Sequence, residues 1–367
     1  MPLAQPRTGV GTYTFELARA LAAEAPADEF ELISPLPYDE TVRDAASVDP
    51  TPANLQLTYS RPNLLQRRWW TLGLPSYIRS HPLDLFHGTN YEAPLRAQCP
   101  TVVTIHDLSL LLHSSTHEAR AVRRARLLLP LMARKASLII TPSELVRNEV
   151  CEHLKIPRDK VFATPLAPRR MFTPMPLPET VETRRRLGIE DEFLLFVGTI
   201  EPRKNLSTVI AALEEVWQTT ALRPQLVVAG KIGWKVDKVL AQARQSAIRD
   251  HVRLVGFVTE EEDLRALYSS CRAFVYPSVY EGFGLPPLEA MACGAPVIAS
   301  RVPSIKESVA RIVSATDYTD LARTIVELLT TPGARKELSE RGVAYARNFT
   351  WQRTAALTRE VYARALG

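Results

Sequence analysis

The sequence predicts an α/β protein with two parallel sheets in two successive domains. Short runs of apolar and β-branched residues alternate with longer amphipathic stretches, which is the pattern of strand–helix–strand units. These runs form two series, separated by a proline-rich segment. The length of 367 residues also favours two domains over one.

The expected strands follow the two series in chain order. The first series covers residues 29–34, 84–87, 101–107, 138–142 and 161–165, and the second covers 193–198, 225–230, 252–257, 273–277, 296–300 and a short run at 311–314. Residues 166–192 hold four prolines and read as a linker followed by a helix over 181–187. The boundary therefore falls near residue 170, giving domains 1–170 and 171–349.

The last segment, residues 350–367, is predicted to be one helix. Its apolar residues recur at helical spacing from Trp351 to Leu366, and Thr350 is a suitable N-cap. At the other end, Gly9 and Gly11 precede a helix expected over 14–22, and a glycine loop before a helix can cradle a phosphate or admit an acceptor. Only eight residues precede Gly9, so we expect either that the chain start is truncated or mis-assigned, or that the first sheet lacks its first strand.

Composition and charge exclude several classes of function. Lysine plus arginine exceed aspartate plus glutamate by 45 to 40, a net charge of +5 that suits an anionic substrate but is too weak for nucleic acid. The four cysteines form no C-x-x-C pair, which excludes zinc-ribbon and redox spacing. No run of 18 apolar residues occurs, so we expect a cytoplasmic protein whose membrane contact is peripheral.

The strongest motif runs from Ser278 to Val297 and contains two glutamates with seven residues between them, Glu281 and Glu289. It follows a strand, passes through Gly282 and Gly284, and enters a helix at paired prolines. The free N–H groups at such a helix start bind phosphate, and a carboxylate can accept two hydrogen bonds from a ribose diol. The alternative is that Glu289 complements the helix dipole while Glu281 is a solvated loop charge.

A second motif places cations after another strand. The strand ends at Gly198, and Arg203 and Lys204 follow in the next turn. Such cations can neutralise a diphosphate, and they favour the transition state in which a leaving diphosphate gains charge. The alternative is a helix start with incidental surface charges.

The glutamate motif resembles that of the retaining glycosyltransferases of family 4, which have the GT-B fold of two facing Rossmann-like domains. The similarity extends over nearly the whole chain. It implies that Glu289 binds the nucleotide ribose, that Glu281 contacts the donor sugar, that Arg203 and Lys204 bind the diphosphate, and that the C-terminal helix packs on the first domain. Many members have Gly-Arg where this chain has Gly198-Thr199, so Arg203 is a subgroup variant.

A third motif is Val103-Thr-Ile-His106-Asp107, a buried strand that delivers a histidine to its carboxyl end. The resemblance implies that His106 hydrogen-bonds a hydroxyl of the donor sugar; His87 is a weaker candidate for the same role. A lone histidine at a strand end is otherwise more often structural. The residues expected to bind the donor are Gly9, Gly11, Gly198, Arg203, Lys204, Gly282, Phe283, Gly284, Leu285 and Glu289, with Glu281, His106, Arg203 and Lys204 expected to be catalytic.

Two motifs are absent from the sequence. There is no D-x-D, so neither a metal nor another cofactor is expected, and there is no full G-x-G-x-x-G, which weakens a dehydrogenase. The stretch from Arg120 to Lys135 is basic and interleaved with leucines, so it is either a helix on an anionic membrane or a packed helix with a basic rim. Pro130 is expected to kink or end that helix.

The family resemblance implies a glycosyltransferase that moves a sugar from a nucleoside-diphosphate sugar to a hydroxyl of a glycan or lipid-linked acceptor. The stretch from Gly198 to Asn205 resembles that of bacterial mannosyl- and rhamnosyl-type members, which implies a hexose such as mannose and a role in surface polysaccharide synthesis. Two alternatives remain open at this stage. A GT-B epimerase would isomerise the donor without an acceptor, and a non-catalytic protein would only bind it.

Overall fold

The computed structural model describes residues 3–4, 9–39, 52–60, 69–94, 97–189 and 192–367. The chain divides into two compact units. Unit 1 comprises residues 1–111, 120–167 and 349–367, and unit 2 comprises residues 112–119 and 168–348. The sequence places residues 112–119 in the first domain, whereas their contacts group them with unit 2, because His117 stacks on Trp234 and Lys235 Nζ donates to the Ser115 carbonyl.

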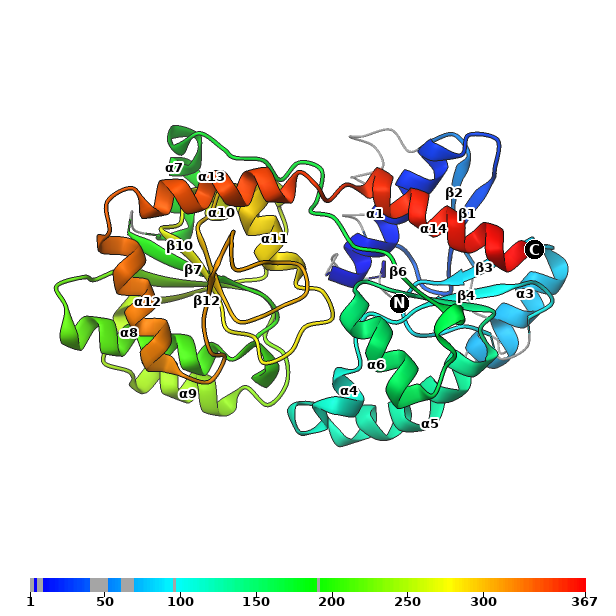
Figure 1. Ribbon diagram of the computed structural model, residues 1–367, viewed down its shortest axis with the longest axis horizontal. Helices are drawn as coiled ribbons and strands as arrows, with labels where there is room; N and C mark the ends of the chain where they lie inside the picture. Colours follow the sequence, from blue (N-terminus) through cyan, green and yellow to red (C-terminus); the bar gives the residue numbers. More distant parts are fainter. Residues whose placement is uncertain (1–2, 5–8, 40–51, 61–68, 95–96, 190–191) are drawn as a thin grey trace. The chain divides into compact units, whose positions relative to one another are not determined.

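Unit 1 holds two parallel sheets (Figure 1). In the first, β1 (Phe30–Ser34) pairs with β2 (Leu55–Tyr59), and in the second, β3 (Phe86–Gly88), β4 (Thr101–Thr104), β5 (Leu138–Thr141) and β6 (Val161–Ala163) pair in that order. The helices of this part of the chain are α1 (Gly9–Glu24), α3 (Leu74–Ser80), α4 (Ser109–Leu112), α5 (Ala119–Lys135), α6 (Glu144–Leu154) and α14 (Trp351–Leu366).

The start of unit 1 differs from the sequence prediction in two ways. The prediction of a glycine loop before the helix is wrong, because Gly9 and Gly11 lie within the first turn of α1. Strand β2 was not predicted, since its five residues, Leu-Gln-Leu-Thr-Tyr, alternate between apolar and polar and form no continuous apolar run. Residues 1–2 and 5–8, where the missing first strand is at issue, lie outside the described residues. Among the described strands, no pairing joins the two sheets of unit 1.

Helix α14 follows the chain back to unit 1 and packs along α1 (Figure 1). Thr350 caps it by accepting a hydrogen bond from the Arg353 N–H, as the sequence suggests. Its inner face buries Trp351, Ala355 and Val361, and Val361 joins Val102 and Ile140 of the sheet in one apolar cluster. Truncating a fully buried tryptophan of this kind costs about 3–5 kcal/mol. The helix is therefore an integral layer of unit 1.

Unit 2 is a six-stranded parallel sheet in the order β12-β11-β10-β7-β8-β9. The strands are β7 (Phe193–Val197), β8 (Gln225–Ala229), β9 (Val252–Gly256), β10 (Ala273–Tyr276), β11 (Val297–Ala299) and β12 (Arg311–Ile312). Residues of β7, β8 and β10 are buried on both faces, as expected of a parallel sheet covered by helices.

Two groups of helices cover that sheet, one on each side (Figure 1). The first group is α8 (Leu206–Thr219), α9 (Asp237–Gln245) and α12 (Tyr318–Thr330), and the second is α7 (Leu177–Leu187), α10 (Glu261–Ser270), α11 (Leu285–Ala292) and α13 (Ala334–Ala346). The main core lies between the sheet and the first group, with Val209, Leu213 and Leu321 buried against it.

Candidate active site

The centre of the candidate site is Glu281, in the loop that follows β10. Its side chain is 9% exposed, and its Oε1 accepts hydrogen bonds from Lys204 Nζ at 2.6 Å and Ser278 Oγ at 2.6 Å. The Tyr276 hydroxyl donates to the same oxygen at 2.9 Å. The guanidinium of Arg203 pairs with the other oxygen, Oε2, at 3.2 Å. The structure thus brings together three side chains that the sequence assigns to catalysis.

Both cations come from a short 3-10 turn, Pro202–Lys204, that follows β7. Strands β7 and β10 are neighbours in the sheet, so the loops at their carboxyl ends meet at one edge. Arg203 is held on two further sides, because its Nη2 pairs with Glu201 Oε1 at 2.6 Å and its Nη1 donates to the Tyr280 carbonyl at 2.7 Å. Lys204 Nζ also donates to the Tyr276 hydroxyl.

Sequence reasoning missed Glu201 and Tyr276. Glu201 stands two residues before Arg203, and this spacing could have marked it as a partner of that arginine. In the structure Glu201 is buried. Tyr276 reads only as the last residue of a buried strand. Its role depends on a contact across 72 residues of sequence, which no local pattern reports.

The cluster keeps Glu281 ionised. Burial alone would raise the pKa of this carboxyl, but Lys204 and Arg203 outweigh burial and lower the pKa to about 2. Burial lowers the pKa of Lys204, and the charge of Glu281 opposes that change. Burial also raises the pKa of Glu201, against the charge of Arg203.

The sequence predicts Glu289 in the first turn of the helix that begins at the paired prolines, and the structure places it one turn later. Helix α11 begins at Leu285, so Glu289 lies in its second turn and not in its first. It is 3% exposed, and Arg169 Nε lies 3.3 Å from its Oε1. Burial raises the pKa of Glu289 to about 7, with Arg169 acting in the opposite direction and Glu261 adding to the increase. Arg169 lies in the predicted linker, where nothing in the sequence marked it as a site residue.

The glycine loop before α11 is built for close backbone approach. Gly284 caps the helix with φ +94°, a conformation that favours glycine, and an added Cβ would meet Val302 at 2.7 Å. The side chains of Phe283 and Leu285 are buried, so a ligand at the helix start would meet their backbone. Pro286 and Pro287 have no N–H, so the N–H groups without helical partners at the start of α11 are those of Gly284 and Leu285, and these can donate to an anion.

Gly198 and Gly230 show a similar tight approach at the ends of β7 and β8. A Cβ at Gly230 would meet the Gly198 carbonyl oxygen at 1.9 Å. Gly198 itself has φ +151°, and a Cβ added there would meet the Lys204 side chain at 3.9 Å. The predicted strand-end glycine therefore lies beside the cation cluster.

His106 belongs to unit 1, as do Gly9 and Gly11. Its Nε2 donates to the Thr89 carbonyl at 2.8 Å, and the ring of Tyr13 meets it edge-on with centroids 4.9 Å apart. Burial lowers the pKa of His106, so the ring is neutral at neutral pH. With Nε2 donating, Nδ1 is the acceptor that remains for a hydroxyl.

His87 has partners on both ring nitrogens. Nδ1 lies 2.6 Å from the Tyr362 hydroxyl, and Nε2 lies 2.7 Å from Thr104 Oγ1. Burial lowers the pKa of His87 to about 3. This ring therefore links α14 to β4 as a structural group, which favours His106 as the ligand-binding histidine.

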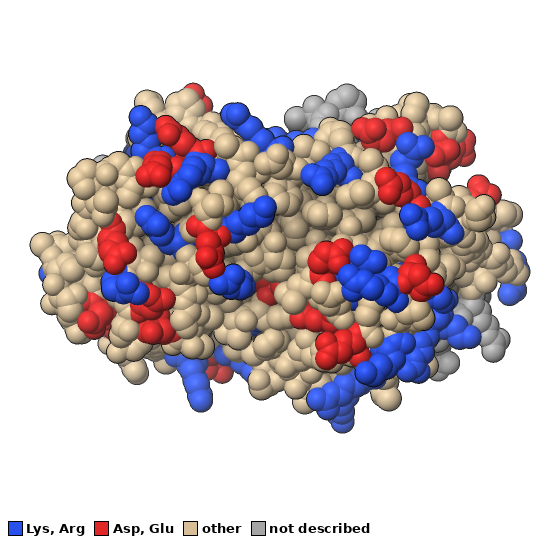
Figure 2. Space-filling model, in the orientation of Figure 1, with Lys and Arg blue, Asp and Glu red and all other residues tan. Residues whose placement is uncertain are grey.

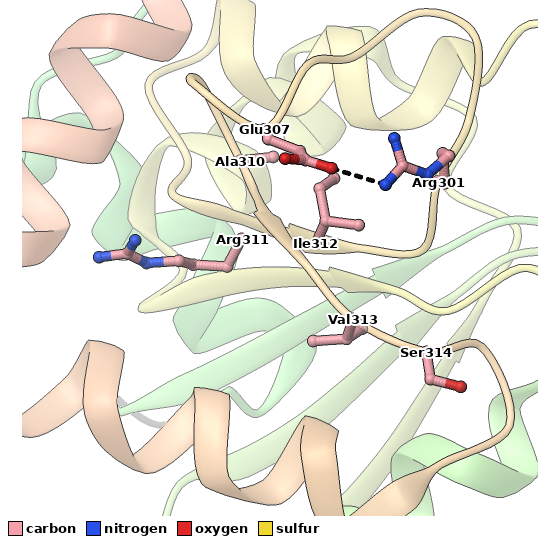
Figure 3. Close-up of a pocket in the computed structure, with 7 residues that line it drawn as sticks. All are labelled: Arg301, Glu307, Ala310, Arg311, Ile312, Val313 and Ser314. Atoms are coloured by element: carbon pink, nitrogen blue, oxygen red, sulfur yellow. Dashed lines mark hydrogen bonds and ion pairs between the residues drawn. The ribbon is translucent and has the colours of Figure 1, made fainter.

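A surface hollow beside β12 lies outside this cluster (Figure 3). Its lining includes Arg301 and Glu307, which form an ion pair at 2.6 Å, and none of the predicted site residues. In the described part of the chain, no group of three or more His, Cys, Asp or Glu side chains is arranged to hold a metal ion. Across the same residues, the helices are too short or too polar to span a membrane.

Comparisons with known proteins place the chain in a family. The model described as Glycosyltransferase Family 4 matches residues 7–166, and that described as Glycosyl transferases group 1 matches residues 180–347. The chain is 30% identical over 379 residues to the O-antigen chain mannosyltransferase B of Escherichia coli, covering 98% of this chain and 97% of that protein.

Solved structures show the same architecture. HepE from Anabaena, solved with UDP and glucose, has a TM-score of 0.76 at 18% identity and covers 98% of this chain and 97% of its own. WaaG, a glycosyltransferase involved in lipopolysaccharide biosynthesis, has a TM-score of 0.72 at 16% identity, covering 98% and 96%. The fold is GT-B, with two Rossmann-like domains, and the chain belongs to the glycosyltransferases of family 4.

Proposed function

We propose that this glycosyltransferase is a retaining mannosyltransferase, which moves mannose from a nucleoside-diphosphate sugar to a hydroxyl of a growing bacterial surface polysaccharide. The mannose and the polysaccharide rest on the similarity to the O-antigen chain mannosyltransferase B. The observation that carries the site is the buried cluster of Arg203, Lys204 and Glu281.

Arg203 and Lys204 would bind the diphosphate of the donor. Of the three N–H donors of Lys204, two are accepted among the described residues, by Tyr276 and Glu281, which leaves one for a phosphate oxygen. The N–H groups at the start of α11 would supply further donors. When the glycosidic bond breaks, negative charge grows on the diphosphate, and cations fixed beforehand stabilise that charge most in the transition state.

The remaining residues would orient the sugar nucleotide. Glu289 would accept hydrogen bonds from the ribose diol, and ionised Glu281 would accept one from a hydroxyl of the mannose. In unit 1, His106 would accept a hydroxyl hydrogen bond through Nδ1. In the reaction, the bond from the anomeric carbon to the phosphate oxygen breaks and the bond to the acceptor oxygen forms on the same face. The acceptor proton passes to the leaving diphosphate.

A thermal-shift screen followed by product analysis tests this function. GDP-mannose, UDP-glucose, dTDP-rhamnose and ADP-glucose would be compared, and only the first carries mannose. We expect GDP-mannose to raise the melting temperature most, because a ligand stabilises the fold in proportion to its occupancy. With a mannan oligosaccharide acceptor, NMR of the product should show an α-linkage.

Three results would contradict the proposal. If none of the four donors shifts the melting temperature, the protein does not bind a nucleotide sugar. A β-linked product would exclude retention. An isomerised donor formed without acceptor would identify an epimerase instead.

We also propose a cytoplasmic location with peripheral contact to the anionic inner face of the membrane, through α5. Its inner stripe is Val122, Leu129, Met132 and Ala133. Its outer face is basic and includes Leu127, which is 70% exposed, and Leu131. Lysine and arginine gather where α5 lies at the lower right of Figure 2. Exposed leucines among basic residues suit an anionic lipid surface that a lipid-linked acceptor shares.

A further inference from the structure

Arg169 is a buried arginine that the function described so far does not use. It follows Pro168 at the start of unit 2, and its side chain is 14% exposed. Its Nε lies 3.3 Å from Glu289 Oε1 and 3.7 Å from Glu261 Oε1. One guanidinium thus faces two carboxylates, one on α11 and one at the start of α10.

A tight turn and an aromatic ring hold this guanidinium in place. The Phe172 N–H donates to the Arg169 carbonyl at 3.0 Å, which closes the chain over residues 169–172. The turn brings the ring of Phe172 under the guanidinium, with 5.0 Å between Cζ and the ring centroid. Phe172 in turn packs edge-on against Tyr268 of α10, with centroids 5.8 Å apart.

We propose that Arg169 is a positioning residue for nucleotide binding, which favours the ionised form of the Glu289 carboxyl and fixes the orientation in which it accepts the ribose diol. The inference rests on the proposed role of Glu289. Glu289 Oε1 accepts no hydrogen bond from the described residues, although it is buried, so an acceptor at this oxygen is available to a ligand hydroxyl.

Electrostatics support the geometry. The titratable and charged groups that face Glu289 are Arg169 from the start of unit 2, Glu261 and Tyr268 from α10, and Cys293 at the end of α11. Burial and Glu261 raise the pKa of Glu289, and Arg169 opposes them. Without Arg169, the pKa of Glu289 would rise further, so a larger share of the carboxyl would hold its proton at neutral pH and lose acceptor capacity.

The test measures nucleotide affinity by titration calorimetry. The probe is GDP or UDP, whichever the wild type binds more tightly, together with its 2′-deoxy counterpart, at pH 7 and pH 9. We expect Arg169→Gln to weaken ribonucleotide binding about tenfold or more at pH 7, the size of a lost hydrogen bond to a charged group, with little effect on the deoxynucleotide. Raising the pH to 9 should restore much of the loss, because Glu289 then ionises without help.

Three further variants separate positioning from packing. Arg169→Lys keeps the charge and should retain most of the affinity. Arg170→Gln removes the same charge from the exposed neighbour and should leave binding unchanged. Arg169→Gln combined with Glu289→Gln should bind the ribonucleotide no more weakly than Glu289→Gln alone. Circular dichroism would verify that each variant is folded.

The outcomes separate the inference from the function on which it rests. An equal loss for both nucleotides in Arg169→Gln, or additive losses in the double variant, would overturn the role of Arg169. If the wild type binds both nucleotides equally and Glu289→Gln changes neither affinity, the ribose role of Glu289 fails, and the inference fails with it.

Discussion

Lys204 donates to Glu281 and to Tyr276 in a buried cluster, and the proposed mechanism asks it to stabilise the leaving diphosphate as well. We expect Lys204→Ala to lower kcat about 100- to 1000-fold, the usual effect of removing a preorganised group that stabilises developing charge. The fold should persist, because Arg203, Ser278 and Tyr276 still contact Glu281. Initial rates and circular dichroism check both expectations.

The matched control is Lys238→Ala, which removes an exposed lysine from α9 in the same unit. Its turnover should equal that of the wild type. Wild-type turnover in Lys204→Ala itself would refute the assignment of this cluster to the reaction.

The raised pKa of Glu289 makes a prediction about stability. The ordinary value is 4.5 and the folded value is about 7, so the folded protein retains a proton that the unfolded chain has lost between these values. Stability therefore falls as pH rises through this window. At about 1.4 kcal/mol per pKa unit, the full loss is about 3 kcal/mol by pH 8.

Glu289→Gln removes this titration and serves as the comparison, because the other carboxyl groups titrate in both proteins. We expect the free energy of unfolding of the wild type, relative to that of the variant, to fall by about 3 kcal/mol between pH 4.5 and pH 8. Urea unfolding at four pH values measures it. A constant difference would show that the folded pKa of Glu289 is ordinary.

At this scale the sequence predicted residues that follow strands, and it failed for residues whose role comes from long-range contacts. Arg203, Lys204 and Glu281 stand just after strands, where ligands of parallel sheets bind, and they lie together. Tyr276 was not predicted as a site residue, because in the sequence it is only the last residue of a buried strand. The role of Arg169 was not predicted, because its partner Glu289 lies 120 positions away in the sequence, on a separate helix.

The secondary-structure elements were predictable where their pattern is strong. The buried strands of unit 2 form continuous apolar runs, and each expected strand there corresponds to an observed one. Strand β2 was missed because its short alternation of apolar and polar residues forms no continuous apolar run of the kind that marks the buried strands. The prediction that Pro130 kinks or ends its helix was wrong about the end, because α5 continues to Lys135. Burial of Leu129, Met132 and Ala133 against unit 1 outweighs the one hydrogen bond that proline removes.

The continuous α5 makes the proposed membrane contact testable. We expect Arg123→Gln with Arg126→Gln to weaken binding to phosphatidylglycerol vesicles about 30-fold, since each basic residue near an anionic surface contributes about 1 kcal/mol. Vesicle co-sedimentation measures the affinity, which should also fall with salt. The control, Arg353→Gln with Arg359→Gln on α14, removes two exposed charges from the same unit and should bind as the wild type does. Equal losses in both pairs would exclude α5 as the contact.

At the scale of the whole molecule, the sequence predicted two domains because the strand runs form two series. It placed the boundary near residue 170, and the structure changes unit between residues 167 and 168. The return of the C-terminal helix to unit 1 followed from the family resemblance alone, since helical spacing shows which face is buried but not against what. The contacts of residues 112–119 with Trp234 and Lys235 could not be predicted either, because no periodic pattern records a loop that packs on a distant segment.

The charge balance of the site leads to the last prediction. Arg203 and Lys204 already face Glu201 and Glu281, two cations against two carboxylates, so the donor diphosphate needs further positive potential. A metal ion can supply it, and so can the start of α11, where Gly284 and Leu285 have N–H groups without helical partners. The chain has no D-x-D sequence, so we propose that the start of α11 supplies this potential. We therefore expect turnover to be unchanged in an excess of EDTA and not to rise when Mg²⁺ or Mn²⁺ is added. Gly284→Ala, which strains the cap of α11, should raise the KM for the donor. Loss of activity in EDTA that added Mn²⁺ restores would assign the missing charge to a metal.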